Sequence, residues 1–191
     1  MDSLQKVLDF LSAFTKTTWE EKQAMIKNAR FSSFKKNEII QEQGKLSIKA
    51  AFILRGSVRY YYVDEDGSER TVHFGFEGQP TVIFDSFQNQ IVSNFSIQCM
   101  ESTHILWTSR SDFFGFIERF PRYQLILHKI LSEWLEKRNN HVKFLNISAA
   151  SERYRVMMKD RPKIIKRVPL KYIASYLNIT QETLSRIRAE K

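Results

Sequence analysis

The side chains best suited to recognising a ligand lie in one short stretch near the end of the sequence. Residues 180–188 read TQETLSRIR, in which Leu184 and Ile187 are apolar and the other side chains are polar. On a helix, Leu184 and Ile187 share one face, which leaves an outward polar face. The outward residues are Gln181, Glu182, Ser185, Arg186 and Arg188. Arginine binds guanine O6 and N7, glutamine pairs with adenine and glutamate accepts from cytosine N4, so this face has the chemistry that reads duplex DNA.

The residues before this face predict a second helix joined to it by a tight turn. Pro169 suits the first turn of a helix, because its missing N–H costs nothing there. The apolar side of that helix consists of Ile173, Ala174 and Leu177. Asn178 stands where a left-handed residue is needed, and Thr180 can cap the next helix. Two short helices joined in this way form a helix-turn-helix.

Basic residues are concentrated in the same part of the chain. The formal net charge is +9, and residues 148–191 contribute +7 of it from eleven basic and four acidic residues. Such an excess is the electrostatic footprint of a protein that binds a polyanion. Within it, Lys171 is a candidate phosphate contact. A solvated basic tail would carry the same charge, so charge alone does not distinguish the two.

The sequence lacks the patterns of common catalytic and metal sites. No HExxH, GxSxG, P-loop or GxGxxG motif occurs, which argues against an enzyme. A single cysteine, Cys99, excludes a disulfide framework, a CxxC zinc site and an iron–sulfur cluster. We therefore expect no catalytic residue, no metal site and no cofactor. A histidine could still hold haem, which leaves haem sensing as an alternative.

Length and composition indicate a globular protein. The chain has 191 residues, of which 42% are hydrophobic and 27% charged. No apolar run approaches the ~18–20 residues of a membrane span. The first residues, MDSLQKVLDFLSAF, are too acidic and too short in apolar residues for a signal peptide. We expect a cytoplasmic protein without a membrane partner.

The middle of the chain predicts β-structure between helical ends. All six glycines lie between positions 44 and 115, which places the turns there. Helices are expected over 4–14 and 18–29, the second from a capping-box pattern at its start. Short strands are expected at 51–54, 57–63, 69–76, 94–100 and 104–109. Strands at this spacing indicate an antiparallel jelly roll or β-roll, so the expected fold class is α+β.

A long helix is expected from about Pro121 to residue 147. Its apolar residues alternate in steps of three and four, as in a coiled-coil seam. Two overlapping seams are possible. Together they contain Leu127, Leu131, Trp134, Leu135, Arg138, His141, Val142 and Leu145. The helix could pack only on its own domain. A homodimer is favoured because two apolar stripes allow one to face the domain and the other a partner helix.

The stretch IASYLNITQETLSRIR, residues 173–188, resembles the recognition motif of the Crp/Fnr superfamily of bacterial transcription regulators. Residues 35–74 and 95–121 look like the two halves of the family's cyclic-nucleotide-binding β-roll. The resemblance implies a β-roll domain at 1–116, a dimerisation helix at 117–147 and a winged-helix-like helix-turn-helix domain at 148–191. It also implies a homodimeric transcription regulator that binds a palindromic operator in double-stranded DNA and contacts RNA polymerase.

The resemblance assigns roles within the last helix. The family's matching positions, here Gln181, Glu182 and Arg186, contact base edges, and Thr183 and Ser185 lie beside them at the DNA backbone. The full expected DNA-binding set is Lys171, Thr180, Gln181, Glu182, Thr183, Ser185, Arg186 and Arg188. Few residues follow this helix, so we expect the family's final wing strands to be short or absent.

The phosphate-binding cassette departs from the family pattern. Effector-binding members carry FGE(L/I/M)AL and close with Arg-Ser/Thr-Ala, whereas residues 81–96 read TVIFDSFQNQIVSNFS. Ile83 then replaces the glutamate, and Ser93 and Asn94 replace the arginine and its hydroxyl neighbour. Without that ion-pairing arginine, we expect no cyclic AMP binding in the usual mode. With Phe84, these residues either line a pocket for a non-nucleotide ligand or fill the core.

Overall fold

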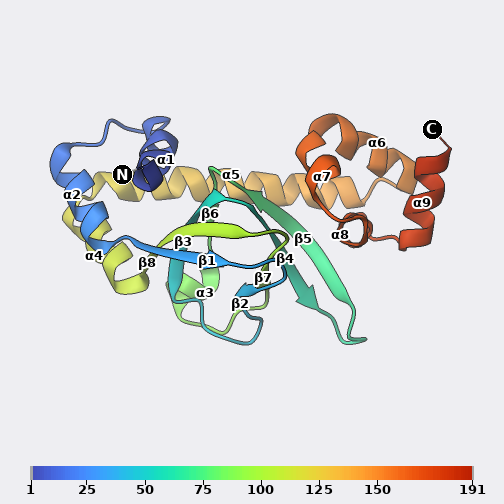
Figure 1. Cartoon of the computed structure of the whole chain (residues 1–191), viewed down its shortest axis with the longest axis horizontal. Helices are drawn as coiled ribbons and strands as arrows, with labels where there is room; N and C mark the ends of the chain where they lie inside the picture. Colours follow the sequence, from blue (N-terminus) through green and yellow to red (C-terminus); the bar gives the residue numbers. More distant parts are fainter. Residues whose placement is uncertain (1, 191) are drawn as a thin grey trace.

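The chain begins with two short helices that lie beside the sheets (Figure 1). The computed structural model describes residues 2–190. Helix α1 is Asp2–Ser12 and helix α2 is Trp19–Asn28. The Thr18 hydroxyl accepts from the Glu21 N–H, while the Glu21 carboxylate accepts from the Thr18 N–H at 2.7 Å. The predicted capping box therefore begins α2, because it satisfies two helix-end donors.

Two antiparallel sheets of four strands each form the β-roll within residues 2–190. The first sheet contains, in spatial order, β1 (Arg30–Phe34), β8 (Thr103–Ser109), β3 (Lys49–Arg55) and β6 (Pro80–Thr81). The second contains β2 (Ile39–Gln41), β7 (Ser96–Cys99), β4 (Ser57–Val63) and β5 (Glu69–Phe76). The α+β expectation is confirmed, and β4 and β5 have the bounds that the sequence predicts.

The core of the β-roll lies between the two sheets. Ile53, Val58 and Ile97 are almost fully buried in one cluster. Helix α3 (Phe84–Asn89) follows β6 and closes one end of the roll. The hairpin formed by β4 and β5 projects beyond the remaining strands (Figure 1). Its turn contains Gly67 at φ 81°, a left-handed conformation that glycine adopts without steric cost.

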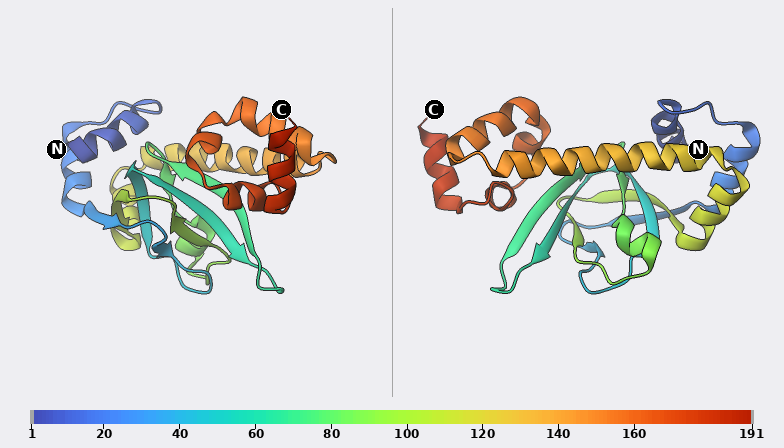
Figure 2. Two further views of the ribbon diagram at one scale, coloured as in Figure 1. Left: turned by 45° about the vertical axis from the view of Figure 1, so that its right-hand side comes forward. Right: turned by 180° about the vertical axis from the view of Figure 1, so that it is seen from behind.

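One long helix connects the β-roll to the C-terminal helices (Figure 2). Helix α4 (Arg110–Arg119) precedes it, and α5 itself runs over Arg122–Leu145, which is 24 residues. The dimerisation helix implied by the resemblance, 117–147, is longer than α5 at both ends. Residues 117–119 belong to α4, because the chain turns at Phe120, and α5 ends before its C-cap residue Asn146.

The chain after α5 contains four further helices within its described part, and no strand. They are α6 (Ala150–Asp160), α7 (Pro162–Arg167), α8 (Leu170–Tyr176) and α9 (Gln181–Ala189). Helix α7 was not expected, because a proline such as Pro162 commonly interrupts a helix. It starts α7 instead, in a position where its missing N–H is harmless. Pro169 was expected inside α8 but is its N-cap, at ψ 140°.

The C-terminal helices pack against the β-roll of the same chain. Phe74 and Phe76 of β5 share one buried cluster with Tyr172 and Ile173 of α8. The Ser175 hydroxyl accepts from the Thr71 N–H at 2.9 Å and donates to the Glu69 carbonyl at 2.8 Å. Helix α8 is thus held along the edge of β5 by apolar burial and by hydrogen bonds. Over residues 2–190, no helix combines the length and apolar character needed to cross a membrane.

Candidate nucleic-acid interface

The turn between α8 and α9 brings the two helices into a helix-turn-helix. Asn178 has φ 54°, the left-handed conformation that the sequence predicts at this point. The Ile179 N–H donates to the Ala174 carbonyl at 3.0 Å, and the Asn178 N–H donates to the Ser175 carbonyl at 3.1 Å. These bonds satisfy carbonyls at the end of α8 and reverse the chain within a few residues.

Thr180 is the N-cap residue of helix α9, which begins at Gln181. The Thr180 hydroxyl accepts from the Thr183 N–H at 3.2 Å, which satisfies one free donor of the first turn. Hydrogen bonds from its own backbone N–H and from the Thr180 hydroxyl hold the pKa of Glu182 below its ordinary value, as does nearby Arg186. Glu182 is therefore a carboxylate and can act as a hydrogen-bond acceptor.

The two faces of α9 differ sharply in exposure. Leu184 is 1% exposed and packs in the cluster that contains Ile173 and Leu177, both 0% exposed. Ile187 packs against the same cluster. The exposed side chains are Gln181, Glu182, Ser185, Arg186 and Arg188. Thr183 is half-buried at the cap, whereas Thr180 is exposed. The structure thus brings five hydrogen-bonding side chains together on one solvent-facing surface.

Lys171 lies on α8, apart from the five exposed polar side chains of α9. Its side chain is exposed, and its Nζ lies 4.7 Å from the ring centroid of Tyr172. This cation–π contact restrains the lysine on the surface of the helix-turn-helix. From this place it can approach a phosphate without entering a groove.

Several basic residues counted in the C-terminal excess are used inside the molecule. Arg153 is 9% exposed, and its guanidinium donates to the carbonyls of Leu177, at 3.1 Å, and Ser148, at 3.2 Å. Arg167 donates to Glu77 at 2.7 Å and to Glu101 at 2.5 Å. Sequence reasoning missed these roles, because the acceptors are backbone groups or lie in the β-roll. The charge available to a polyanion is smaller than the count implies.

The residues of the expected helix seam fall into two groups. Leu127, Leu131 and Trp134 are half-buried against their own domain. The remaining apolar residues of the seam face solvent, with Leu135 at 60%, Val142 at 54% and Leu145 at 37% exposure. Arg138 is also exposed. Solvent-facing leucine and valine side chains at heptad-like spacing form an unpartnered apolar stripe.

The residues of the altered cassette do not gather around one space. Ile83 is 5% exposed and packs in the β-roll core with Ile53. The Ser93 hydroxyl donates to the Phe95 carbonyl at 2.6 Å, so it holds its own loop. Asn94 faces solvent, and Phe84 lines a separate apolar cavity beside α5. The sequence left open whether these residues line a ligand pocket or fill the core. Ile83 fills the core.

Among the described residues, no group of three or more His, Cys, Asp and Glu side chains is arranged to hold a metal ion. Burial raises the pKa of Cys99 to about 11 and lowers the pKa of His73 to about 4. Cys99 is thus a neutral thiol in the core and His73 a neutral imidazole near neutral pH.

No protein-family model and no curated protein matches the sequence, but the fold matches solved structures closely. FixK2 from Bradyrhizobium japonicum superposes with a TM-score of 0.73 at 19% identity, covering 85% of this chain and 83% of FixK2. The c-di-GMP responsive regulator CLP of Xanthomonas campestris gives 0.75 at 13% identity, with 91% of each chain covered. A putative Crp/Fnr-family regulator from Eubacterium rectale gives 0.76 at 14% identity, with 94% of this chain and 85% of that chain covered.

This chain has the Crp/Fnr-type fold. The resemblance noted in the sequence is therefore confirmed at the level of the fold. The Crp/Fnr-type fold explains why the β-roll, α5 and the helix-turn-helix follow one another in this order. Helix α9 lies at one end of the molecule, away from the N-terminal helices (Figure 2).

Proposed function

We propose that this chain is a sequence-specific DNA-binding transcription regulator that acts as a homodimer in the cytoplasm. The observation that carries the proposal is the polarity of α9, whose exposed face carries Gln181, Glu182 and Arg186 while Leu184 is 1% exposed. A helix that only stabilised its own domain would need no such cluster of hydrogen-bonding groups beside a basic surface.

Base reading is assigned to α9. Arg186 can donate two hydrogen bonds to guanine, Gln181 can pair with adenine, and Glu182 can accept from cytosine. Lys171, Thr180, Thr183, Ser185 and Arg188 surround these residues and serve as contacts to the DNA backbone or groove wall. Contacts to phosphates position the helix and make binding salt-dependent, whereas the base contacts supply the sequence preference.

Dimerisation is assigned to the exposed stripe of α5. Leu135 and Val142 are too exposed for core residues, and a second copy of the helix would remove them from water. A two-fold dimer would present two copies of α9 to successive major grooves about 34 Å apart, on a palindromic operator. A DNA-bound dimer would then act on transcription through RNA polymerase.

Regulation by cyclic AMP in the usual mode is not part of the proposal. Ile83 occupies core space where the family has a ribose-binding glutamate, and Ser93 is engaged with Phe95. An anionic cyclic phosphate would find no arginine at the Ser93 position. A ligand other than a nucleotide is the candidate effector.

Selection of bound sequences from a random duplex pool tests this function. We expect enrichment of an inverted repeat whose half-sites are about 10 base pairs apart from centre to centre. The matched control is the triple variant Gln181→Ala, Glu182→Ala, Arg186→Ala, which should retain salt-dependent binding but enrich no sequence. Indifference of the unmodified chain to duplex DNA at low ionic strength would refute the proposal.

A further inference from the structure

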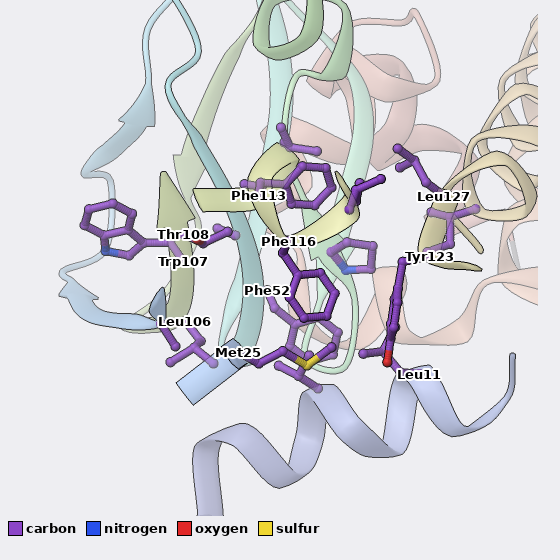
Figure 3. Close-up of a pocket in the computed structure, with 18 of the residues that line it drawn as sticks. Leu11, Met25, Phe52, Leu106, Trp107, Thr108, Phe113, Phe116, Tyr123 and Leu127 are labelled. Carbon is purple, nitrogen blue, oxygen red and sulfur yellow. The ribbon is translucent and has the colours of Figure 1, made fainter. Parts of the chain in front are cut away.

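A large apolar cavity lies among the helices at the opposite end of the molecule from α9 (Figure 1), and Figure 3 shows its wall in close-up. Its volume is about 240 Å³. The walls come from helices α1, α2, α3, α4 and α5 and from strands β3, β6 and β8. Its aromatic rings include Phe52, Phe116 and Tyr123, and the Phe116 and Tyr123 ring centroids are 4.8 Å apart.

The cavity wall offers almost no polar group to a ligand. Among its described residues there is no lysine, arginine or histidine. The Trp107 Nε1–H donates to Ser32 at 2.9 Å and the Tyr123 hydroxyl donates to Glu21 at 3.3 Å. The remaining polar wall residues are the uncharged Asn28 and Thr108 and the acidic Asp112, whose carboxylate would repel an anion. An anion would therefore lose its hydration without gaining a partner.

The size of the space sets what can occupy it. Water in an apolar cavity lacks the hydrogen-bond partners it needs, and engineered apolar cavities of about 150 Å³ stay dry and bind benzene. The present cavity is larger, so it has room for a molecule of about two aromatic rings or a comparable alkyl chain. The described wall contains no lysine, arginine or histidine to pair with the propionates of a haem, so these carboxylates would lose their hydration without gaining a cation.

We propose that this cavity binds an uncharged, apolar small molecule, which is the effector of the regulator. Of the altered cassette, Phe84 lines the cavity, whereas Ile83 and Ser93 do not. Its α5 wall includes Leu127, Leu131 and Trp134, three residues of the expected dimer seam. These three side chains are half-buried within their own chain, and the proposed dimer stripe of Leu135 and Val142 lies on the same helix. A ligand in the cavity therefore contacts the helix that carries the proposed dimer stripe. The regulatory role rests on the proposed function, whereas binding itself rests on the cavity alone.

Fluorescence titration with 1-aminonaphthalene, an uncharged two-ring aromatic probe, tests the site directly. Trp107 and Trp134 line the cavity, so a bound probe should take up their emission by energy transfer. Trp19 is 75% exposed and is not part of the wall. We expect saturable binding with one probe per chain. Absence of saturable energy transfer in the intact chain would overturn the proposal.

Two cavity-filling variants locate the bound probe. Ala24→Phe on α2 and Ala51→Leu on β3 each add carbon atoms to a wall residue. We expect each to weaken probe binding at least tenfold while the circular dichroism spectrum stays unchanged. Ala13→Phe, at an exposed position outside the wall, is the matched control and should bind like the original chain. Equal binding by all three variants would place the probe elsewhere and contradict the site.

Competition against the bound probe tests which chemical class of ligand the cavity accepts. We expect 1-decanol to displace the probe and decanoate, which has the same chain length and a negative charge, to be at least tenfold weaker. Equal potency would show that the site accepts anions and would overturn the uncharged assignment. None of these binding measurements uses DNA. A failure to bind the probe is therefore distinguishable from a failure of the operator selection.

Discussion

The guanidinium of Arg59 on β4 lies 3.9 Å from the ring centroid of Tyr172 on α8. It also lies 4.0 Å from the ring centroid of Tyr61, so the cation contacts an aromatic ring of the β-roll and one of the helix-turn-helix. Its side chain is 2% exposed and also donates to Gln98 and pairs with Glu69. No described residue accepts a hydrogen bond from its Nη1. Arg59 is thus a charged connection between two parts of the chain.

Removing this cation should loosen α8 from the β-roll. Arg59→Ala is expected to cost about 2 kcal/mol, the scale of a desolvated cation–π contact. The backbone amide of Thr71 reports the docked state, because it donates to Ser175 of α8. Hydrogen exchange at Thr71 should accelerate in Arg59→Ala and remain slow in Arg55→Ala, a change at an exposed arginine. Unchanged protection of Thr71 in both variants would contradict the proposed connection.

Base and phosphate contacts on the helix-turn-helix should respond differently to substitution. Arg186→Ala is expected to cost about 1–3 kcal/mol on the selected operator and to relax the preference at one base pair. Lys171→Ala should weaken operator and random duplexes alike and reduce the salt slope by about 1. Fluorescence anisotropy with both duplexes over a salt series measures these effects. An equal loss on both duplexes for Arg186→Ala would make it a phosphate contact.

The α5 stripe should be required for dimerisation. Leu135→Glu places a charge among apolar side chains of the proposed seam and is expected to yield monomers in sedimentation velocity. Leu125→Glu is the matched control, because Leu125 is 69% exposed on the same helix but lies off the seam. It should leave the sedimentation coefficient unchanged. A dimer that survives Leu135→Glu would mean that the copies associate through another surface.

Stability should fall in mildly acidic solution. Burial lowers the pKa of His73 from 6.5 to about 4, and the charges of Arg161, Lys137 and His141 act in the same direction. Between about pH 4 and 6.5 the unfolded chain then binds more protons than the folded chain, so the free energy of unfolding falls as the pH falls. We expect a loss of about 1–2 kcal/mol from His73 between pH 6.5 and 5.

Urea unfolding at several pH values measures this effect. His73→Gln should flatten the dependence of the unfolding free energy on pH, because its side chain does not titrate. His128→Gln, at an exposed histidine of α5, is the control and should keep the original slope. Identical slopes in the original chain and in His73→Gln would refute the assignment.

Cyclic AMP should not bind in the cassette. Calorimetric titration is expected to give no binding heat, since Ile83 fills core space and Ser93 replaces the arginine that would pair with the phosphate. Titration of the same sample with the selected duplex provides the positive control. A micromolar affinity for cyclic AMP would show that the loop rearranges to form a phosphate site.

Local signals in the sequence predicted much of the fold. The strands β4 and β5 alternate with clear turn residues, so their bounds could be predicted to the residue. Asn178 and Thr180 could be predicted as turn and cap, because short-range hydrogen bonding decides both positions. The exposed face of α9 follows from helix periodicity once its first residue is known.

Features that depend on distant residues could not be predicted. Arg59 and Tyr172 are 113 positions apart, and an arginine in a strand gives no sign of an aromatic partner in another domain. The cavity left no signal either, because periodicity tells which side chains point inward and not whether they fill the space. Helix α7 could not be predicted either, because proline both ends and begins helices and Pro162 alone does not distinguish the two.

Helix α5 is unbroken over its 24 residues, a length of about 36 Å at 1.5 Å per residue. Its first half walls the cavity, and near its other end His141 and Phe144 stack on Tyr176 of α8, with ring centroids 4.4 Å and 5.9 Å away. A stiff rod passes rotation about its axis from end to end. A twist imposed at the N-terminal helices therefore reaches the base of the helix-turn-helix without any joint in between.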